Sequence, residues 1–208
     1  MVSRGGSRAD RTATAKSEAT RARVLDAAAR VLAREGYSGT RLTDVAKEAE
    51  VQAPAIYYYF ASREELIEEV AATGAQSLLD ETTAATDALP ADAGPLDRID
   101  AVAEAHIRFT MTSPDIARVV LRNQEQFPAD PPLRHVAILQ RYHRTWSGLL
   151  RDAQQQGLID ASVDLAVARH LALGALNSAL DWWSPGRTSI TKVVEQTRFL
   201  LRRGLGGR

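Results

Sequence analysis

The stretch from Thr40 to Leu66, TRLTDVAKEAEVQAPAIYYYFASREEL, decides the fold of the chain. Apolar residues recur three and four positions apart from about Arg41 to Ala49, which predicts a short helix there. Beyond a tight turn, Pro54 suits the first turn of another short helix that ends near Phe60, because the missing N–H of proline is not needed there. Two short helices joined in this way are typical of a helix-turn-helix, which places its second helix in the major groove of DNA.

The flanking residues complete a small helical domain around this motif. One helix is predicted to begin near Ser17 and to end at Gly36, because glycine accepts a positive φ. Ser62 is expected to cap a further helix, and Glu65 three positions later completes a capping box. Residues 18–64 are therefore predicted to form a helix-turn-helix DNA-binding domain.

The start of the second motif helix carries the side chains expected to read bases. Gln52 can hydrogen-bond to adenine through its amide, and Ala53 or Ala55 can contact a thymine methyl group. Together with Pro54, these small or short side chains allow the backbone to lie deep in the groove.

Three successive tyrosines, Tyr57, Tyr58 and Tyr59, follow on the same helix. Neighbouring side chains on a helix point about 100° apart, so the three cannot all be buried. We expect Tyr57 and Tyr59 to place their hydroxyls on phosphates and Tyr58 to lie at the groove edge, while Ile56 and Phe60 face inward. The alternative is an aromatic stripe packed in a core.

Three more side chains are expected to hold the flanks of the motif on phosphates. Arg41 and Thr43 lie at the start of the first motif helix, and Arg63 lies at the start of the helix after the motif. The full predicted DNA-binding set is Arg41, Thr43, Gln52, Ala53, Pro54, Ala55, Tyr57, Tyr58, Tyr59 and Arg63.

Residues 1–17 are predicted to be a disordered basic arm, because they are polar and lack apolar periodicity. The arm is either a solvated tail or a segment that contacts phosphates or the minor groove. The charge distribution favours DNA at this end of the chain: residues 1–63 hold eleven Lys/Arg and seven Asp/Glu, a net of +4, whereas residues 64–208 hold fifteen and nineteen, a net of −4. The basic residues of the arm are Arg4, Arg8, Arg11 and Lys16.

This head resembles the TetR family of one-component transcriptional regulators over roughly residues 20–70. The resemblance implies a homodimer that acts as a repressor on a palindromic double-stranded DNA operator and releases it when a small-molecule effector enters the body. The residues that carry the resemblance are Gly39-Thr40, Val45-Ala46, Val51, Ala55-Ile56-Tyr57, Tyr59-Phe60, Glu64 and Leu66.

Three positions depart from the family pattern. Glu50 stands where the family usually has the turn glycine, so the turn is either strained or built differently. Gln52 stands where Ser or Thr commonly caps the second motif helix, which predicts a weaker cap. Arg63 replaces the usual lysine and adds a planar fork that can clamp a phosphate through two hydrogen bonds.

Residues 65–208 are predicted to form a helical ligand-binding and dimerisation domain, so the fold class is all-α with an N-terminal three-helix head. No stretch of period-two alternation predicts a strand. Residues 164–183 are apolar nearly all round, which predicts one helix buried on more than one side. This helix and another over 188–203 carry more apolar surface than one chain can bury, so we expect both to pair with their copies in a four-helix dimer seam.

The cluster of Asn177, Asp181 and Trp182 is either aromatic packing at a helix or dimer seam, or part of a pocket wall. The run Gly-Ala-Leu-Asn at 174–177, followed by Trp-x-x-Pro-Gly at 182–186, is similar to TetR-family regulators that control fatty-acid or sterol breakdown and bind acyl-CoA thioesters. That similarity implies an acyl-CoA-type effector.

Other candidate ligand contacts are less distinctive. Arg118 and Arg122 are candidates for pairing with an anionic effector of this kind. His106, Phe109 and Trp146 lie on apolar helix faces, so they are either core residues or contacts of the ligand. The candidate ligand-binding set is His106, Phe109, Arg118, Arg122, Trp146, Asn177, Asp181 and Trp182.

Other classes of protein fit the sequence less well. The four histidines form no H-E-x-x-H motif, and neither a G-x-S-x-G elbow nor a Gly-rich phosphate loop is present. We therefore predict no enzyme activity, catalytic residue, metal site or cofactor. The absence of cysteine and of any apolar run of about 18 residues favours a cytoplasmic protein without a membrane partner. The alternative functions are a helical interaction module and a regulator without a small-molecule effector.

Overall fold

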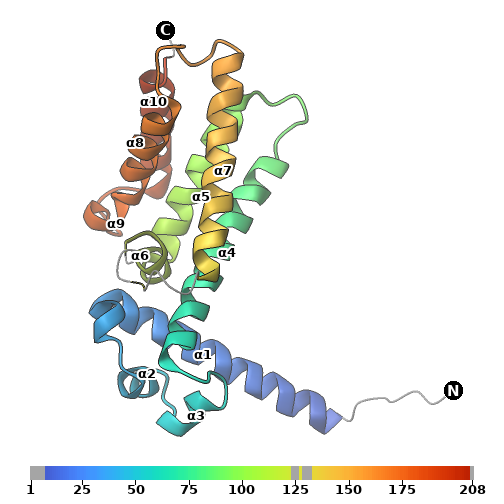
Figure 1. The fold of residues 1–208 in the computed structure, drawn as a ribbon, viewed down its shortest axis with the longest axis vertical. Helices are drawn as coiled ribbons and strands as arrows, with labels where there is room; N and C mark the ends of the chain where they lie inside the picture. Colours follow the sequence, from blue (N-terminus) through green and yellow to red (C-terminus); the bar gives the residue numbers. More distant parts are fainter. Residues whose placement is uncertain (1–7, 123–126, 128–132, 207–208) are drawn as a thin grey trace, which may run out of the picture. The chain divides into compact units, whose positions relative to one another are not determined.

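The computed structural model describes residues 8–122, 127 and 133–206, apart from the side chains of residues 8–13 and 122. These residues contain helices and turns and no strand, which confirms the all-α prediction. The chain divides into two compact units, Met1–Val70 and Ala71–Arg208. Its helices in the described residues (Figure 1) are α1 (Arg8–Gly39), α2 (Leu42–Glu48), α3 (Ala53–Tyr57), α4 (Arg63–Asp87), α5 (Pro95–Thr112), α6 (Pro114–Arg122), α7 (Arg134–Gln155), α8 (Leu165–Asn177), α9 (Ala179–Trp182) and α10 (Ile190–Gly204).

In the first unit α2 packs against both α1 and α3, and Arg21 of α1 pairs with Glu69 of α4 at 2.6 Å. Val45 of α2 and Leu66 of α4 are fully buried there. Ile56 and Phe60 are buried as well, so the prediction that they face inward is confirmed. A fully buried aliphatic or aromatic side chain contributes about 1.5–3 kcal/mol, so these few residues hold the short α3 in place.

The first helix is longer than the sequence predicts. A disordered arm over residues 1–17 is wrong for residues 8–17, which belong to α1. This segment contains three alanines and neither Gly nor Pro, the two residues that most oppose a helix. Residues 1–7 lie outside the described part of the chain. At the other end, α1 is interrupted at Gly36, whose φ of 70° and ψ of 178° confirm the expected positive φ.

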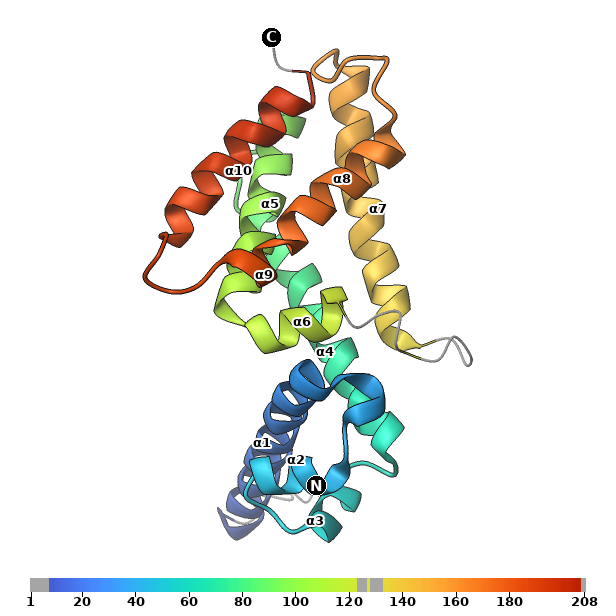
Figure 2. The same cartoon turned by 90° about the vertical axis from the view of Figure 1, so that its left-hand side faces the viewer.

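The second unit is arranged around α5, which contacts α6, α7, α8, α9 and α10 (Figure 2). Helix α5 is accordingly buried on most of its surface, with Val102 and Phe109 in the apolar core. Trp146 and Leu150 of α7 complete this core and are fully buried. No helix in the described residues is both long enough and apolar enough to span a bilayer.

Ion pairs fix α10 on α5. Arg202 lies 2.6 Å from Asp97 and 2.7 Å from Asp100, and Arg198 contacts Glu104. Burial raises the pKa of Asp100, whereas the hydrogen bond from Arg202 acts in the opposite direction. These charged contacts set the position of α10 along α5, since the apolar contacts between the helices are not directional.

The expected single helix over 164–183 is two helices, α8 and α9, separated at Ser178. The Ser178 hydroxyl donates to the Ala175 carbonyl at 2.7 Å, and such local bonds compete with the helical pattern. In the single chain this segment is buried on one side only, because Leu171 is 70% exposed, so its expected burial by a second copy stays a prediction. Asp164 caps the start of α8 by accepting hydrogen bonds from the backbone N–H groups of Ala166 and Val167.

Candidate DNA-binding surface and effector pocket

The turn between α2 and α3 is a Schellman motif. The Val51 N–H donates to the Ala46 carbonyl at 3.0 Å, and the Glu50 N–H donates to the Lys47 carbonyl at 3.2 Å. Glu50 occupies the position that usually holds glycine, and its φ is 54°. The turn therefore has the geometry that usually requires glycine. Glu50 adopts the left-handed conformation there, which is strained for a residue with a Cβ atom.

Helix α3 begins at Ala53 with Gln52 as its N-cap residue, and Pro54 lies in its first turn, as predicted. The Gln52 side chain makes no capping hydrogen bond, which confirms the expected weak cap. Gln52 is also exposed, so its amide is available to an outside partner. Ala53 and Ala55 are half-buried and present little bulk beside it.

The three tyrosines have different surroundings. Tyr57 is exposed, and Tyr58 is the most exposed of the three at 79%. Tyr59 is half-buried and accepts a hydrogen bond from the Ser17 hydroxyl of α1 at 3.3 Å. The Tyr58 and Tyr59 rings meet edge to face, with centroids 4.9 Å apart. Two phenol groups are thus accessible, while the third helps to hold α3 on α1.

Arg63 makes contacts within the first unit that the sequence does not predict. Its Nε–H donates to the Thr40 carbonyl at 2.6 Å, and its Nη2 group donates to the Tyr37 carbonyl. Its guanidinium also lies 4.8 Å from the centroid of the Tyr37 ring and pairs with Glu64 at 2.8 Å. Arg63 therefore fastens the start of α4 to the connection between α1 and α2. Its predicted contact with phosphate stays a prediction.

The other two expected phosphate contacts lie at the start of α2. Arg41 is its N-cap residue and Thr43 lies in its first turn, and both side chains are exposed. Arg30 of α1 pairs with Glu48 at 2.8 Å, which ties the end of α2 to α1. The exposed Arg41 thus lies at the start of a helix whose other end is paired with α1.

A pocket of about 720 Å³ lies in the second unit and brings together residues of four helices. Its volume lies within the roughly 300–1,000 Å³ that is usual for small-molecule sites. The lining residues are His106 of α5, Leu121 of α6, Leu139, Tyr142 and His143 of α7, and Arg169, His170, Leu173, Gly174 and Asn177 of α8.

His106 is fully buried at this pocket, and its Nδ1 atom lies 2.6 Å from the Tyr142 hydroxyl. The Trp146 indole N–H donates to the same hydroxyl oxygen at 2.8 Å. Within the described part of the chain, neither Nε2 of His106 nor Oδ1 of Asn177 has a hydrogen-bond partner. Two buried polar atoms at one pocket thus lack partners, which is uncommon in folded proteins.

Burial also controls the charge of the histidines. It lowers the pKa of His106 to about 4, an effect that the nearby Asn177 side chain partly offsets, so the ring is neutral at pH 7. Burial lowers the pKa of His143 as well, and Arg169 and His170 act in the same direction. Arg169 is half-buried, with its guanidinium 3.5 Å from Nε2 of His170.

Two family models match the chain. Residues 24–70 match bacterial regulatory proteins of the tetR family, and residues 92–205, more than half of the chain, match the tetracyclin repressor-like C-terminal domain. The chain belongs to the TetR family of transcriptional regulators. Proteins of this family are regulators and not enzymes, which confirms that the chain is not an enzyme.

Individual relatives agree with this assignment. The fatty acid metabolism regulator protein of Bacillus subtilis is 22% identical over 160 residues, which cover 77% of this chain and 81% of that protein. The solved structure of the TetR-family regulator PfmR from Thermus thermophilus has a TM-score of 0.75 and 26% identity, and the match covers 89% of this chain and 97% of that one. The structure of AibR, solved with isovaleryl coenzyme A and operator DNA, has a TM-score of 0.78 and 20% identity over 88% of this chain and 97% of that one.

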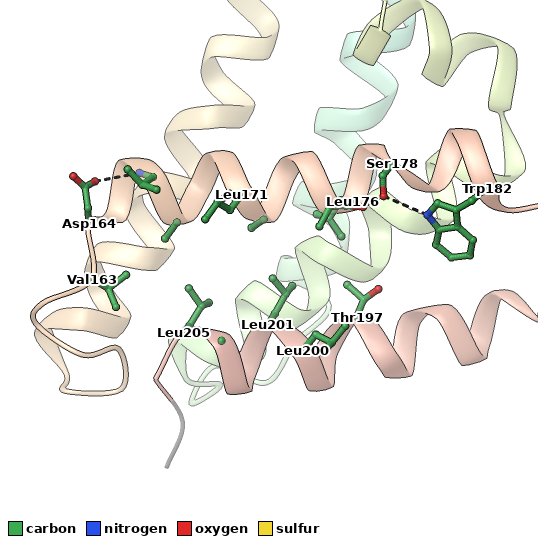
Figure 3. A pocket seen from close by; sticks show the side chains of 15 residues that line it. Val163, Asp164, Leu171, Leu176, Ser178, Trp182, Thr197, Leu200, Leu201 and Leu205 are labelled. Carbon is green, nitrogen blue, oxygen red and sulfur yellow. Dashed lines mark hydrogen bonds between the residues drawn. The ribbon is translucent and has the colours of Figure 1, made fainter.

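This TetR-family regulator also has an apolar groove between α8 and α10, with a volume of about 610 Å³ (Figure 3). Leu171 and Leu176 of α8 point toward Leu200 and Leu201 of α10 across it. Trp182 lies at one end, where its indole N–H donates to the Ser178 hydroxyl at 3.3 Å. The groove differs from the pocket at His106 in being lined almost entirely by apolar side chains.

The predicted ligand set of the regulator is therefore divided among several places. Only His106 and Asn177 line the pocket together, whereas Trp182 lies in the groove between α8 and α10. Asp181 is exposed, and Arg118 is directed to the Leu180 carbonyl at 3.5 Å. Phe109 and Trp146 are core residues. The side chain of Arg122 lies outside the described residues.

Sequence reasoning missed four polar residues at the pocket, Tyr142, His143, Arg169 and His170. Tyr142 and Trp146 lie one helical turn apart, and this spacing of two hydrogen-bonding aromatics was the available signal. Arg169 and His170 are hidden in the apolar run of α8, where charged residues look like the solvated side of a buried helix.

Proposed function

We propose that this TetR-family regulator is a repressor that binds a palindromic operator as a homodimer and releases it when an apolar or acyl-CoA-type effector enters the second unit. The DNA-binding part of the proposal depends on Gln52, the N-cap residue of α3. Its side chain is exposed and makes no capping hydrogen bond. A side chain at this position of a helix-turn-helix reaches base edges in the major groove.

The neighbours of Gln52 support a close approach to DNA. Ala53 and Ala55 leave room for the α3 backbone to enter the groove, and the exposed Tyr57 and Tyr58 can donate to phosphates on either side. Arg41 adds a positive charge at the start of α2. Base reading therefore falls to Gln52, with Ala53 or Ala55 meeting a thymine methyl, and positioning falls to the flanking residues.

The homodimer is supported by the apolar face of α8 and α10. Val167, Leu171, Phe199 and Leu200 are all more than half exposed in the single chain. An exposed apolar surface of this kind is typical of a subunit interface, and pairing with a second copy buries it around a two-fold axis. Two copies of α3 then contact successive major grooves about 34 Å apart.

The effector is supported by the pocket at His106 and by the relatives. The B. subtilis relative is a fatty acid metabolism regulator, and AibR was solved with isovaleryl coenzyme A. The pocket has a volume suited to a small molecule and has apolar side chains from Leu121, Leu139 and Leu173. A regulator without an effector and a helical interaction module remain the competing functions.

Selection of duplexes from a random library, followed by gel shifts, tests the DNA-binding part. We expect Gln52→Ala to change the preferred base at one position of each half-site by about 1–3 kcal/mol, since an amide pairs with adenine through two hydrogen bonds. Tyr57→Phe should weaken binding to all sequences equally.

The matched control is Gln140→Ala, which removes an exposed glutamine of α7 in the second unit and should leave both properties unchanged. Wild-type protein that enriches no duplex would favour the interaction module. Unchanged base preference in Gln52→Ala would remove the reading role of Gln52.

A further inference from the structure

The hydrogen bonds of His106 define which of its ring nitrogens carries the proton. Tyr142 has one hydroxyl hydrogen, and its oxygen already accepts from Trp146. If Nδ1 of His106 also donated to this oxygen, the hydroxyl hydrogen would need another acceptor, and the described residues supply only the His106 ring. The Tyr142 O–H therefore donates to Nδ1, and the neutral His106 carries its proton on Nε2.

This assignment makes Nε2–H of His106 a buried donor at the pocket. It has no acceptor among the described residues, although the ring is fully buried. The Asn177 side chain is near enough to act on the ring as a hydrogen-bond partner, but among the residues that the structure describes neither His106 Nε2 nor Asn177 Oδ1 makes a hydrogen bond of normal geometry. An unpaired buried donor is destabilising, and a ligand atom that accepts from it removes that penalty.

The charges at the pocket favour an anion. Arg169 lines it beside His143 and His170, and no Asp or Glu is found among the described lining residues. Arg169 has a histidine as its neighbour at 3.5 Å, and this histidine supplies no negative charge. Three leucines provide the apolar remainder of the lining.

We propose that this pocket binds an anionic acyl compound, whose carbonyl or carboxylate oxygen accepts from Nε2–H of His106 while Arg169 holds its negative charge. The inference rests on the proposed function in one respect, that the effector enters the second unit. It goes further by naming the two side chains that select the ligand. Leu121, Leu139 and Leu173 receive the hydrocarbon part.

Isothermal titration of the full-length protein tests the ligand class with four probes: sodium octanoate, octanoyl-CoA, coenzyme A and 1-octanol. We expect octanoate or octanoyl-CoA to bind at least about tenfold more tightly than octanol, because a charge-assisted hydrogen bond is stronger than a neutral one. Binding of octanoate identifies a free acid, and binding of octanoyl-CoA without octanoate or coenzyme A identifies a thioester. Octanol that binds as tightly as both anionic acyl probes, or no binding by either of those probes, overturns the proposal.

Arg169→Gln then isolates the charge. Arg169 is half-exposed on α8, and we expect its substitution to cause about a tenfold loss of affinity for the anionic probe with no change for octanol. Arg144→Gln is the matched control, because Arg144 is an exposed arginine of α7 that does not line the pocket. Equal losses in the two variants would overturn the assignment of Arg169.

The ring proton is tested separately by ¹⁵N nuclear magnetic resonance of the histidines. His106 should show the Nε2–H tautomer at pH 7, and the Nε2 signal should shift when the anionic probe is added. An Nδ1–H tautomer, or an Nε2 signal that does not respond to a bound probe, overturns the role of His106. These measurements contain no DNA, so a failure here is distinguishable from a failure to bind an operator in the gel shifts.

Discussion

The two units of the chain expose surfaces of opposite chemistry. In the first unit, the exposed residues of α3 and its N-cap are Gln52, Pro54 and Tyr57, and an exposed arginine begins α2. In the second unit, α8 and α10 expose leucine, valine and phenylalanine side chains. A polar surface with tyrosine hydroxyls and an arginine suits the phosphates of DNA. An apolar surface suits contact with another protein surface. The difference supports separate surfaces for contact with DNA and for the proposed self-association.

The two units also differ in the surroundings of their polar side chains. Each unit holds one polar side chain through contacts that the sequence does not predict, Arg63 in the first unit and His106 in the second. Arg63 is half-buried, donates to the Thr40 and Tyr37 carbonyls and pairs with Glu64. His106 is fully buried, and burial lowers the pKa of its ring to about 4, so the ring is neutral at pH 7. The first unit thus supplies acceptors to a partly exposed cation, whereas the second unit buries a neutral ring away from water.

The largest expected effect concerns the apolar surface. Leu171→Asp should convert the dimer into a monomer, since a symmetric interface would bury two unpaired carboxylates at a loss of about 4 kcal/mol or more. Operator affinity should fall with it, because each half-site contact alone is weak. Sedimentation measures the oligomeric state, and Leu158→Asp is the control, because Leu158 is an exposed leucine outside the groove. If both variants stay dimeric, α8 is not at the interface.

The next effect concerns the dependence of stability on pH through the buried His106 of the second unit. The pKa of His106 is about 4 in the folded chain against an ordinary value of 6.5, so the unfolded chain takes up a proton first as the pH falls. Stability from this group is full above about pH 6.5 and is lost toward pH 4, by about 3 kcal/mol in total.

Urea unfolding at a fixed protein concentration from pH 7.5 to about pH 4 measures this loss. His106→Gln should flatten the profile by about 3 kcal/mol relative to wild type, because other titrating groups are present in both proteins. His170→Gln is the control, since it removes an exposed histidine of the same pocket. Parallel profiles for wild type and His106→Gln would contradict the burial of His106.

The two units also differ in how far sequence reasoning reached. The turn at Gly36, the uncapped start of α3 and the inward direction of Ile56 and Phe60 follow from local patterns, and the structure confirms them. Local patterns succeed here because each of these features depends on residues within one or two helical turns.

In the second unit, the pocket depends on contacts between residues far apart in the chain. His106 meets Tyr142 from another helix, and Asn177 reaches the same pocket from a third. Trp182 looked like a neighbour of Asn177, but the break at Ser178 leaves it in the groove between α8 and α10. Helical periodicity specifies which face is apolar, yet it does not specify which helices meet.

Removal of the Arg63 contacts in the first unit is expected to have a smaller effect on stability. Arg63→Ala should destabilise the chain by about 2 kcal/mol, because it removes hydrogen bonds from a charged donor to the Thr40 and Tyr37 carbonyls. Arg63→Lys should recover less than half of this loss, since lysine lacks the planar fork. Chemical unfolding measures both variants, with Arg23→Ala on the exposed side of α1 as the control. Unchanged stability together with weaker DNA binding would mean that phosphate is the main partner of Arg63.

The smallest effect concerns the turn that presents α3. Glu50 holds a φ of 54°, so Glu50→Gly should relieve left-handed strain and raise stability by about 0.5–1 kcal/mol after the greater entropy of glycine in the unfolded chain is subtracted. The midpoint of urea unfolding should rise with an unchanged slope. Glu50→Ala is the matched variant, because it removes the same carboxylate but keeps the Cβ atom that causes the strain. A gain in stability by both variants would mean that the negative charge, and not the backbone, opposes folding at this turn. A gain by Gly alone, with equal improvement of DNA affinity in both, would assign the strain to the backbone and the repulsion of phosphate to the carboxylate.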